Sequence, residues 1–344
     1  MQVRIGVLTG GGDCPGLNAV IRAVVRKGIR HYGDELYGFH DGWKGVVENS
    51  YELLDISRMQ YTLNLGGTVL GTSRYNPFKY DPEARAVFES VERNSLDAVI
   101  AIGGEGTLSC TMELHRRGLN AIGVPKTIDN DIGITERTFG FDTAVTIATD
   151  AIDRLRTTAE SHNRVMVVEV MGRHVGHIAT WAGIAGGATL TLIPEEPFDI
   201  AEVCSTITRR HGKGRYASIV VVAEGAKPAE GTLEIKPDEY DEYGHIRLGG
   251  IGHKVAVEIE ARTGFETRLT VLGHVQRGGS PTAYDRVLST WFGVAAIDAV
   301  HDEAWGQMVA LQSNRVVRVP LADAVRELKY VNPQLWDVAK QFFA

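Results

Sequence analysis

Short apolar runs alternate along this chain with longer stretches of helical spacing. Residues 3–9, 98–102 and 120–124 are nearly continuous apolar runs, and each is predicted to be a buried strand. Apolar residues at turn spacing predict a helix over 18–30 and another that ends at about Arg117. The first third of the chain therefore follows a strand–helix–strand plan.

The same plan continues in the second half of the chain. Further strands are predicted at 165–170, 188–193, 218–223 and 269–272, with amphipathic helices between them, for example at 143–160. Such runs, when they alternate with helices, are typical of parallel sheets covered on both faces. The fold class expected is α/β, with ligands bound beyond the carboxyl ends of the strands. A polar stretch at 227–247 is expected to be a surface excursion.

Length and composition fit an ordinary globular enzyme. The 344 residues suffice for two domains or one large one, and 44% of them are hydrophobic. Cys14, Cys110 and Cys204 lie far apart without a CxxC pair, so neither a disulfide framework nor a zinc site is expected.

Net charge and the lengths of the apolar runs bear on which partners the chain can have. No apolar run approaches the roughly 20 residues that span a bilayer, and the chain enters a strand pattern directly after its N-terminus. We therefore expect no signal peptide, no membrane partner and a cytoplasmic location. The net charge of −7 disfavours nucleic acid, which usually meets a basic face.

A glycine-rich loop at 10–16 joins the first strand to its helix. Glycine lets the backbone approach phosphate oxygens, and a helix N-terminus offers free N–H groups. No Gly-Lys-Ser/Thr follows, so the loop is not a Walker A motif. Phosphate binding and a simple tight turn both remain open at this point.

A second loop, Gly104-Glu105-Gly106-Thr107, repeats this arrangement with a carboxylate inside it. A carboxylate among phosphate-facing amides is suited to Mg²⁺ that bridges to the phosphates, with Glu105 as the metal ligand. Thr107 is expected to cap the following helix and to donate to a phosphate. Glu105 can equally be a solvated acid in a first helical turn, and similar loops occur in NAD and diacylglycerol kinases.

The run Pro125-Lys126-Thr127-Ile128-Asp129-Asn130-Asp131 follows the third strand. Its two acids, Asp129 and Asp131, lie two residues apart, so that one carboxylate can serve as the base toward a substrate hydroxyl while the other helps to hold a metal ion. The alternative is an Asx-rich turn, which is common.

Together the motifs at 11–18, 125–131, 171–173 and 273–280 resemble the 6-phosphofructokinase family. The resemblance runs from Ile5 to about Asp298. It implies two Rossmann-like three-layer α/β/α domains with mainly parallel sheets. The expected domains are 1–140 with about 276–328 for the phosphoryl donor, and about 141–275 with 329–344 for the sugar phosphate, with the active site in the cleft between them.

The resemblance also implies roles for individual residues. The phosphoryl donor is expected at Gly12, Arg74, Tyr75, Gly104, Glu105, Gly106, Thr107 and Lys126. The sugar phosphate is expected at Thr127, Ile128, Asp129, Arg164, Met171, Gly172, Arg173, Glu224, Arg268, His274, Val275, Gln276 and Arg277. Asp129 is the implied base for the 1-hydroxyl, with Thr127 beside it, and Arg173 steadies the transferring phosphoryl group.

The implied assembly is a homo-oligomer, with a tetramer favoured over a dimer. Arg164 and Arg268 are implied to reach the 6-phosphate from a neighbouring subunit, and His274 and Arg277 to complete that anion pocket. The implied substrates are fructose 6-phosphate and ATP with Mg²⁺.

In this family, the choice between ATP and pyrophosphate as donor depends on the residues at positions 106 and 126. Family members that use pyrophosphate carry Asp and Lys there, and familiar bacterial ATP enzymes carry Gly at both, whereas this chain combines Gly106 with Lys126. A carboxylate at 106 would fill and repel the path of an α-phosphate. We therefore expect ATP, with pyrophosphate as the alternative. An NAD kinase-like enzyme and a non-catalytic nucleotide sensor are more distant alternatives, since the first lacks an equivalent of 125–131 and the second has no use for Asp129.

Overall fold

The computed structural model describes residues 2–233 and 250–343, so that most of the predicted polar excursion, 234–247, lies outside the described residues. The chain divides into two compact units: unit 1 is Met1–Thr143 with Arg277–Lys329, and unit 2 is Ala144–Gln276 with Tyr330–Ala344. Within the described ranges, no helix is long and apolar enough to cross a membrane.

Unit 1 is built on a seven-stranded sheet in the order β11-β10-β5-β4-β1-β2-β3. The strands are β1 (Arg4–Gly10), β2 (Glu35–Phe39), β3 (Tyr51–Leu54), β4 (Ala98–Gly103), β5 (Ala121–Pro125), β10 (Gln307–Gln312) and β11 (Arg315–Pro320). The five strands from β10 to β2 pair in parallel, and β3 and β11 add antiparallel edges. Every residue of β4 is buried, as expected of a strand with both faces covered.

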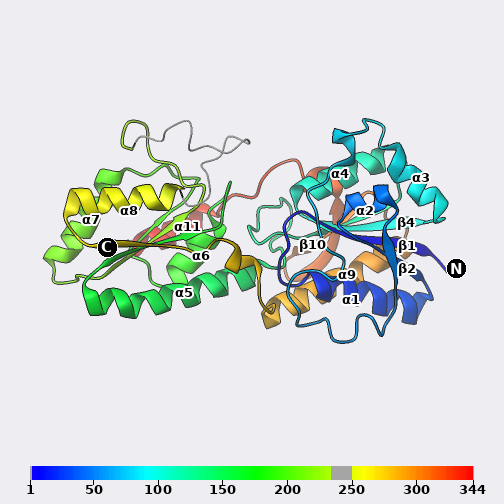
Figure 1. Ribbon diagram of the computed structural model, residues 1–344, viewed down its shortest axis with the longest axis horizontal. Helices are drawn as coiled ribbons and strands as arrows, with labels where there is room; N and C mark the ends of the chain where they lie inside the picture. The colour runs from blue at the N-terminus through cyan, green and yellow to red at the C-terminus, as the bar shows by residue number, and fades with distance from the viewer. Residues whose placement is uncertain (1, 234–249, 344) are drawn as a thin grey trace. The chain divides into compact units, whose positions relative to one another are not determined.

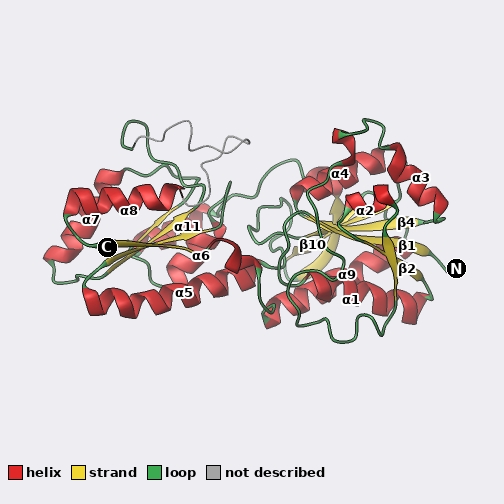
Figure 2. Cartoon of the chain, viewed as in Figure 1, coloured by secondary structure: helices red, strands yellow, loops and turns green. Residues whose placement is uncertain are grey.

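Helices cover both faces of this sheet (Figures 1 and 2). One face carries α2 (Trp43–Glu48), α3 (Arg85–Arg93) and α4 (Glu105–Arg116), with a core that includes Leu8, Phe39 and Val99. The other carries α1 (Leu17–Lys27) and α9 (Ala283–His301), which pack against each other. The short elements η1 (Gly28–Tyr32), η2 (Pro77–Lys79), η4 (Gly273–Arg277) and α10 (Leu321–Ala324) complete the connections.

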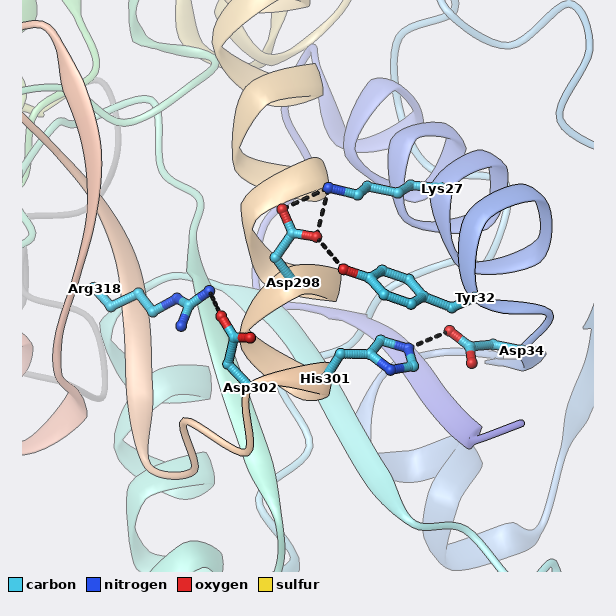
Figure 3. A network of polar contacts seen from close by, with 7 residues as sticks. All are labelled: Lys27, Tyr32, Asp34, Asp298, His301, Asp302 and Arg318. Carbon is cyan, nitrogen blue, oxygen red and sulfur yellow. Dashed lines mark hydrogen bonds and ion pairs between the residues drawn. The ribbon is translucent and has the colours of Figure 1, made fainter. Parts of the chain in front are cut away.

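A polar network joins the end of α1 to the end of α9 (Figure 3). The Lys27 ammonium and the Tyr32 hydroxyl both donate to the carboxylate of Asp298, at 2.6 and 2.8 Å. His301 stacks on the Tyr32 ring and forms a 2.8 Å hydrogen bond with Asp34. The network lies at the amino-terminal end of β2, because Asp34 directly precedes that strand.

Unit 2 contains a four-stranded, fully parallel sheet in the order β7-β8-β6-β9. Its strands are β6 (Val165–Val170), β7 (Leu190–Leu192), β8 (Ser218–Ala223) and β9 (Thr267–Val271), and its helices are α5 (Phe141–His162, which begins in unit 1), α6 (His177–Ala185), α7 (Ile200–Gly212), α8 (Gly250–Thr263) and α11 (Pro333–Gln341). The helices α7 and α8 pack on one face, and α5 lies on the other (Figure 1).

The α/β class with mainly parallel sheets is confirmed. The predicted strands at 165–170 and 218–223 coincide with β6 and β8, whereas β2, β3, β10 and β11 were not predicted. The predicted helix 18–30 lies within a continuous helical run: α1 covers Leu17–Lys27, and five residues of π-helix, Gly28–Tyr32, follow. Tyr32, the last residue of this π-helix, donates to Asp298.

Candidate active site

The loops that follow β1, β4 and β5 line one cavity of about 370 Å³ in unit 1. These three strands are parallel neighbours, so their carboxyl ends meet at one edge of the sheet. The lining residues are Gly11, Gly12, Asp13, Ser73, Arg74, Tyr75, Asn76, Gly104, Glu105, Gly106, Thr107, Lys126, Thr127, Ile128, Asp129 and Arg277. The volume is in the range of small-molecule sites.

The first glycine loop is fixed by its neighbours. The Gly11 N–H donates to the Ser73 carbonyl at 2.9 Å, and the Thr72 hydroxyl donates to the Gly11 carbonyl at 2.6 Å. The Lys126 ammonium donates to the Gly12 carbonyl. A Cβ added at Gly12 would lie 2.9 Å from Nη1 of Arg277, so glycine is needed for this guanidinium to lie against the backbone.

Lys126 is only 3% exposed, and burial lowers the pKa of its ammonium. Sequence reasoning treated it as a residue beside the donor. Its hydrogen bond to the Gly12 carbonyl gives it a second role, because it holds the first glycine loop in place and puts a positive charge next to it. The same burial raises the pKa of the neighbouring Cys14 thiol, so Cys14 is an inert part of this floor.

The second loop opens α4 at the rim of the cavity. Gly104 is the N-cap of the helix, and Glu105 and Gly106 form its exposed first turn. A Cβ added at Gly106 would meet nothing within 4 Å. The first amides of the helix are therefore accessible from the cavity, as anion binding requires.

Thr107 does not cap α4, contrary to expectation. It lies inside the helix, and no side chain caps the N-terminus. Instead it packs against two glycines: a Cβ at Gly103 would lie 2.3 Å from its Cβ, and one at Gly10 would lie 2.6 Å from its hydroxyl. Thr107 thus packs against the ends of β1 and β4 at the wall of the cavity.

The loop after β5 is held by its own polar side chains. The Asp129 N–H donates to the Thr127 hydroxyl at 3.1 Å, and the Thr138 hydroxyl donates to the Thr127 carbonyl at 2.8 Å. Asn130 adopts a left-handed conformation with φ of 54°, and its side-chain oxygen accepts the Thr138 N–H at 3.0 Å. These bonds fix the half-buried Asp129 on the wall of the cavity.

A second set of predicted residues gathers at the carboxyl ends of β6, β8 and β9 in unit 2. Met171-Gly172-Arg173 follows β6, and Glu224 follows β8, where its N–H donates to the Val170 carbonyl at 2.9 Å. Gly172 has φ of 137°, and a Cβ there would lie 2.7 Å from the Val175 carbonyl oxygen.

Fully buried Gln276 ties the turn after β9 to this edge. Its Nε2 donates to the Gly273 carbonyl at 3.1 Å, and its Oε1 accepts the Met171 N–H at 3.4 Å. His274 and Val275, in the same turn, are more exposed. Gln276 is thus a support for the loop rather than a side chain open to a ligand.

Arg164 and Arg268 lie at the opposite, amino-terminal end of the same sheet. Arg164 directly precedes β6, and Arg268 is the second residue of β9. Both guanidinium groups bind one oxygen of Glu266, Arg164 at 2.7 Å, and the Arg164 hydrogen bond lowers the pKa of that carboxyl. Within one chain, these two arginines are therefore not brought together with Arg173 and His274.

Comparison with known proteins identifies the family. The phosphofructokinase family profile matches residues 4–300, which cover both sets of loops. This chain belongs to the phosphofructokinase family.

Two relatives and one solved structure illustrate the range of this phosphofructokinase family. A pyrophosphate–fructose 6-phosphate 1-phosphotransferase of Streptomyces coelicolor is 55% identical over 99% of this chain and its own full length. An ATP-dependent 6-phosphofructokinase of Mycobacterium bovis is 54% identical over the same shares. Phosphofructokinase from Pichia pastoris in the T-state superposes with a TM-score of 0.83 at 31% identity, covering 99% of this chain and 36% of that one. Overall identity to these relatives thus does not separate the two donors.

A magnesium ion in this phosphofructokinase would need few protein ligands. Residues 2–233 and 250–343 contain no group of three or more His, Cys, Asp or Glu side chains arranged to hold a metal. Glu105 is exposed at the rim, with one carboxylate oxygen accepting the Ser109 hydroxyl at 2.9 Å. Mg²⁺ is commonly held by one or two carboxylates together with substrate phosphates, so this donor set fits an ion that arrives with a nucleotide.

Sequence reasoning missed several residues that build the cavity. Ser73 and Thr72 hold the first glycine loop by backbone and hydroxyl bonds, and Asn76 lines the wall. Their only sequence signal was their position next to Arg74 and Tyr75, since hydrogen bonds between distant loops leave no local pattern.

Proposed function

We propose that this chain transfers the terminal phosphoryl group of ATP to the 1-hydroxyl of fructose 6-phosphate, with Mg²⁺, and forms fructose 1,6-bisphosphate. One observation carries the proposal: the carboxylate-bearing loop of Asp129 and the open helix N-terminus at Gly106 line the same cavity. Phosphoryl transfer needs a base and a polyphosphate site within one enclosure.

The donor is bound by unit 1 in this proposal. The first amides of α4, from Gly104 to Thr107, hold its phosphates, and the positive charge of Arg277 beside Gly12 attracts them. Arg74 and Tyr75 contact the rest of the nucleotide. Arg277 was expected at the sugar 6-phosphate, but its contact with Gly12 favours a share in binding the donor.

Asp129 acts as the base. It accepts the proton of the 1-hydroxyl as that oxygen bonds to the terminal phosphorus and the bond to the leaving oxygen breaks. The Thr127 hydroxyl positions Asp129 through the backbone N–H, and Arg173 neutralises charge on the transferring group. Mg²⁺, held by Glu105 and the donor, supplies further charge neutralisation when bound.

Unit 2 binds the sugar in this proposal, through Met171, Gly172, Arg173, Glu224 and His274, together with Thr127 and Ile128. Val275 and Gln276 shape the turn that presents His274. Arg164 and Arg268 reach across to a neighbouring subunit and bind the 6-phosphate of the sugar in its site. This sharing requires a homo-oligomer, with a tetramer favoured. Their separation from the other sugar residues within the chain supports this sharing.

Mixed oligomers test the sharing. Asp129→Asn and Arg268→Ala chains should each be nearly inactive alone, and unfolding and refolding them together should restore roughly a quarter of the wild-type activity. Restoration follows because some sites pair an intact Asp129 with an intact Arg268 from the other chain. If the mixture stays as inactive as its components while oligomers re-form, Arg268 acts within its own chain or not at all.

Pyrophosphate is the second candidate donor. Lys126 supports it by matching the pattern of the family members that use pyrophosphate. Its buried ammonium is itself compatible with either donor, because a positive charge attracts both polyphosphates. ATP leaves ADP and pyrophosphate leaves orthophosphate, so detection of the co-product separates the two donors.

Product analysis tests the function. Phosphorus NMR of a reaction with fructose 6-phosphate, ATP and Mg²⁺ should show fructose 1,6-bisphosphate and ADP in equal amounts. Fructose 1-phosphate, whose acceptor position is blocked, should give no bisphosphate. Sedoheptulose 7-phosphate serves as a competing acceptor, and exclusive turnover of that sugar would overturn the choice of fructose 6-phosphate.

A further inference from the structure

A lysine far from the glycine loops in sequence holds the segment that carries the proposed base. Lys329 is the last residue of unit 1. Its ammonium donates to the side-chain oxygen of Asn130 at 2.8 Å and to the carbonyls of Thr135 and Glu136 at 2.7 and 3.0 Å. Its backbone N–H donates to the Asp131 carbonyl at 2.9 Å. Four bonds from one residue thus fix 130–136, directly after Asp129.

A connected series of hydrogen bonds leads from Lys329 to Asp129. Asn130 accepts both from Lys329 and from the Thr138 N–H, so the lysine and Thr138 share one oxygen. The Thr138 hydroxyl donates to the Thr127 carbonyl, and the Thr127 hydroxyl accepts the Asp129 N–H. Asn130 and Thr138 are 3% and 1% exposed, so solvent does not compete for this chain of bonds.

The choice of lysine suggests more than packing. Taking an ammonium out of water is costly, and an apolar side chain of equal length would fill the space at lower cost. Only the charged form carries three N–H donors, one for each acceptor. Burial lowers the pKa of this ammonium most and Arg137 lowers it further, whereas Asp131 and Glu136 raise it.

We propose that Lys329 is a positioning residue, which holds the loop 127–138 so that Asp129 faces the acceptor hydroxyl. The catalytic part of this proposal rests on the proposed function. Lys329 touches no reacting atom and acts through Asn130, Thr138 and Thr127. Its loss therefore misplaces the base, while the donor loop at Gly104–Thr107 and the sugar-binding residues of unit 2 lie outside the segment that it holds.

The Lys329→Met variant removes the donors and keeps the length of the side chain. Its kcat should fall about 10- to 100-fold, because small misplacements of a catalytic group have effects of that size. The KM for ATP should stay within about threefold of wild type, and the KM for fructose 6-phosphate should change much less than kcat, because only Thr127 and Ile128 of the sugar site lie in this loop. Lys27→Met is the matched control, because Lys27 is also in unit 1 and bonds to Asp298 in the network of Figure 3, outside this loop. The control should keep the wild-type kcat.

Hydrogen exchange of the free protein separates this proposal from the proposed function. Amides of 127–138 should exchange at least about tenfold faster in Lys329→Met and at the wild-type rate in Lys27→Met. This measurement needs no substrate. Inactive wild-type enzyme would overturn the proposed function, while the exchange result would still decide whether Lys329 orders the loop.

Thr138→Val provides an independent variant if Lys329→Met does not fold. It keeps the volume of a buried side chain and removes the hydroxyl that donates to the Thr127 carbonyl at 2.8 Å and to the Asn130 side-chain oxygen at 3.4 Å. The same loss of kcat with unchanged KM is expected. If either folded variant retains wild-type kcat and exchange rates, or loses kcat only as much as Lys27→Met does, Lys329 is a structural residue and the proposal is wrong.

Discussion

Two loops on one cavity are stabilised in opposite ways. The loop at Gly104–Thr107 presents backbone, and a Cβ added at Gly106 would have no atom within 4 Å. The loop that carries Asp129 is held by the side chains of Thr127, Asn130 and Thr138, in bonds of 2.8, 3.0 and 3.1 Å.

This difference matches the chemistry that each loop is proposed to perform. A polyphosphate site needs accessible N–H groups and empty space, so any side chain added there obstructs the ligand. A general base needs one carboxylate in one orientation, so each neighbouring side chain removes freedom that would slow the reaction. We therefore expect substitutions at Gly104–Thr107 to act on donor binding, and substitutions in the loop that carries Asp129 to act on kcat.

The largest effect is expected at Asp129. Asp129→Asn should lower kcat by roughly 10²–10⁴-fold with sugar binding mostly kept, because the amide cannot accept the proton. Steady-state kinetics and a binding titration with fructose 6-phosphate measure the two quantities separately. Full activity in the folded variant would remove Asp129 from the role of base.

Gly106→Asp should affect the other loop. The value of kcat/KM for ATP should fall about 100-fold, since a carboxylate would occupy and repel the phosphate path. Stability should be unchanged or slightly higher, because an acid in the first turn favours the helix and no atom obstructs it. Gly106→Ala, which adds only the methyl group, is the control and should lose much less. Equal losses in the two variants would make the effect steric alone, and unchanged ATP kinetics in Gly106→Asp would refute the donor path.

Glu105→Gln should raise the Mg²⁺ concentration needed for half-maximal activity about tenfold, since one carboxylate ligand is lost. The Ser109→Ala control removes the 2.9 Å hydrogen bond to Glu105 and keeps its charge, so it should leave the Mg²⁺ requirement nearly unchanged. A Mg²⁺ titration of activity compares them. No shift in Glu105→Gln would leave Glu105 as a solvated acid of the helix.

The smallest expected effect is a pH dependence of stability that comes from Lys329, which holds the loop that carries Asp129. Burial lowers the pKa of Lys329 from 10.5 to about 7. The unfolded chain therefore holds a proton that the folded chain releases between these values, so stability from this group is absent below pH 7 and grows as the pH rises toward 10.5. Relative to Lys329→Met, the wild type should gain about 1 kcal/mol in unfolding free energy per pH unit from about pH 7 to 9, allowing for partial solvent exposure.

Denaturant unfolding at about pH 7, 8 and 9 measures this gain. Gly106→Ala serves as the comparison, because position 106 carries no titratable group and its difference from wild type should not depend on pH. A pH-independent difference between wild type and Lys329→Met would show that the ammonium titrates normally.

Elements with a strong local sequence pattern were predicted correctly. Buried strands such as 165–170 and 218–223 have continuous apolar runs, and glycines at 104 and 106 mark a close backbone approach, so both could be read directly. The short edge strands β3 and β11 are only partly buried, and their runs lacked that signal.

Tertiary support could not be predicted. Nothing local in the sequence linked Lys329 to Asn130, which lies far earlier in the chain. Thr107 was expected to cap its helix, but the close approach of Gly10 and Gly103 made it a packing residue. Both roles depend on which strands become neighbours in the sheet.

Turnover with the two donors tests the central claim most directly. Initial rates should be measured with fructose 6-phosphate and equal Mg²⁺, using ATP in one series and pyrophosphate in the other. We predict that kcat/KM for ATP is the larger, because Gly106 leaves the phosphate path open. Robust turnover with pyrophosphate and none with ATP would contradict the account and would give Lys126, rather than Gly106, control of the donor.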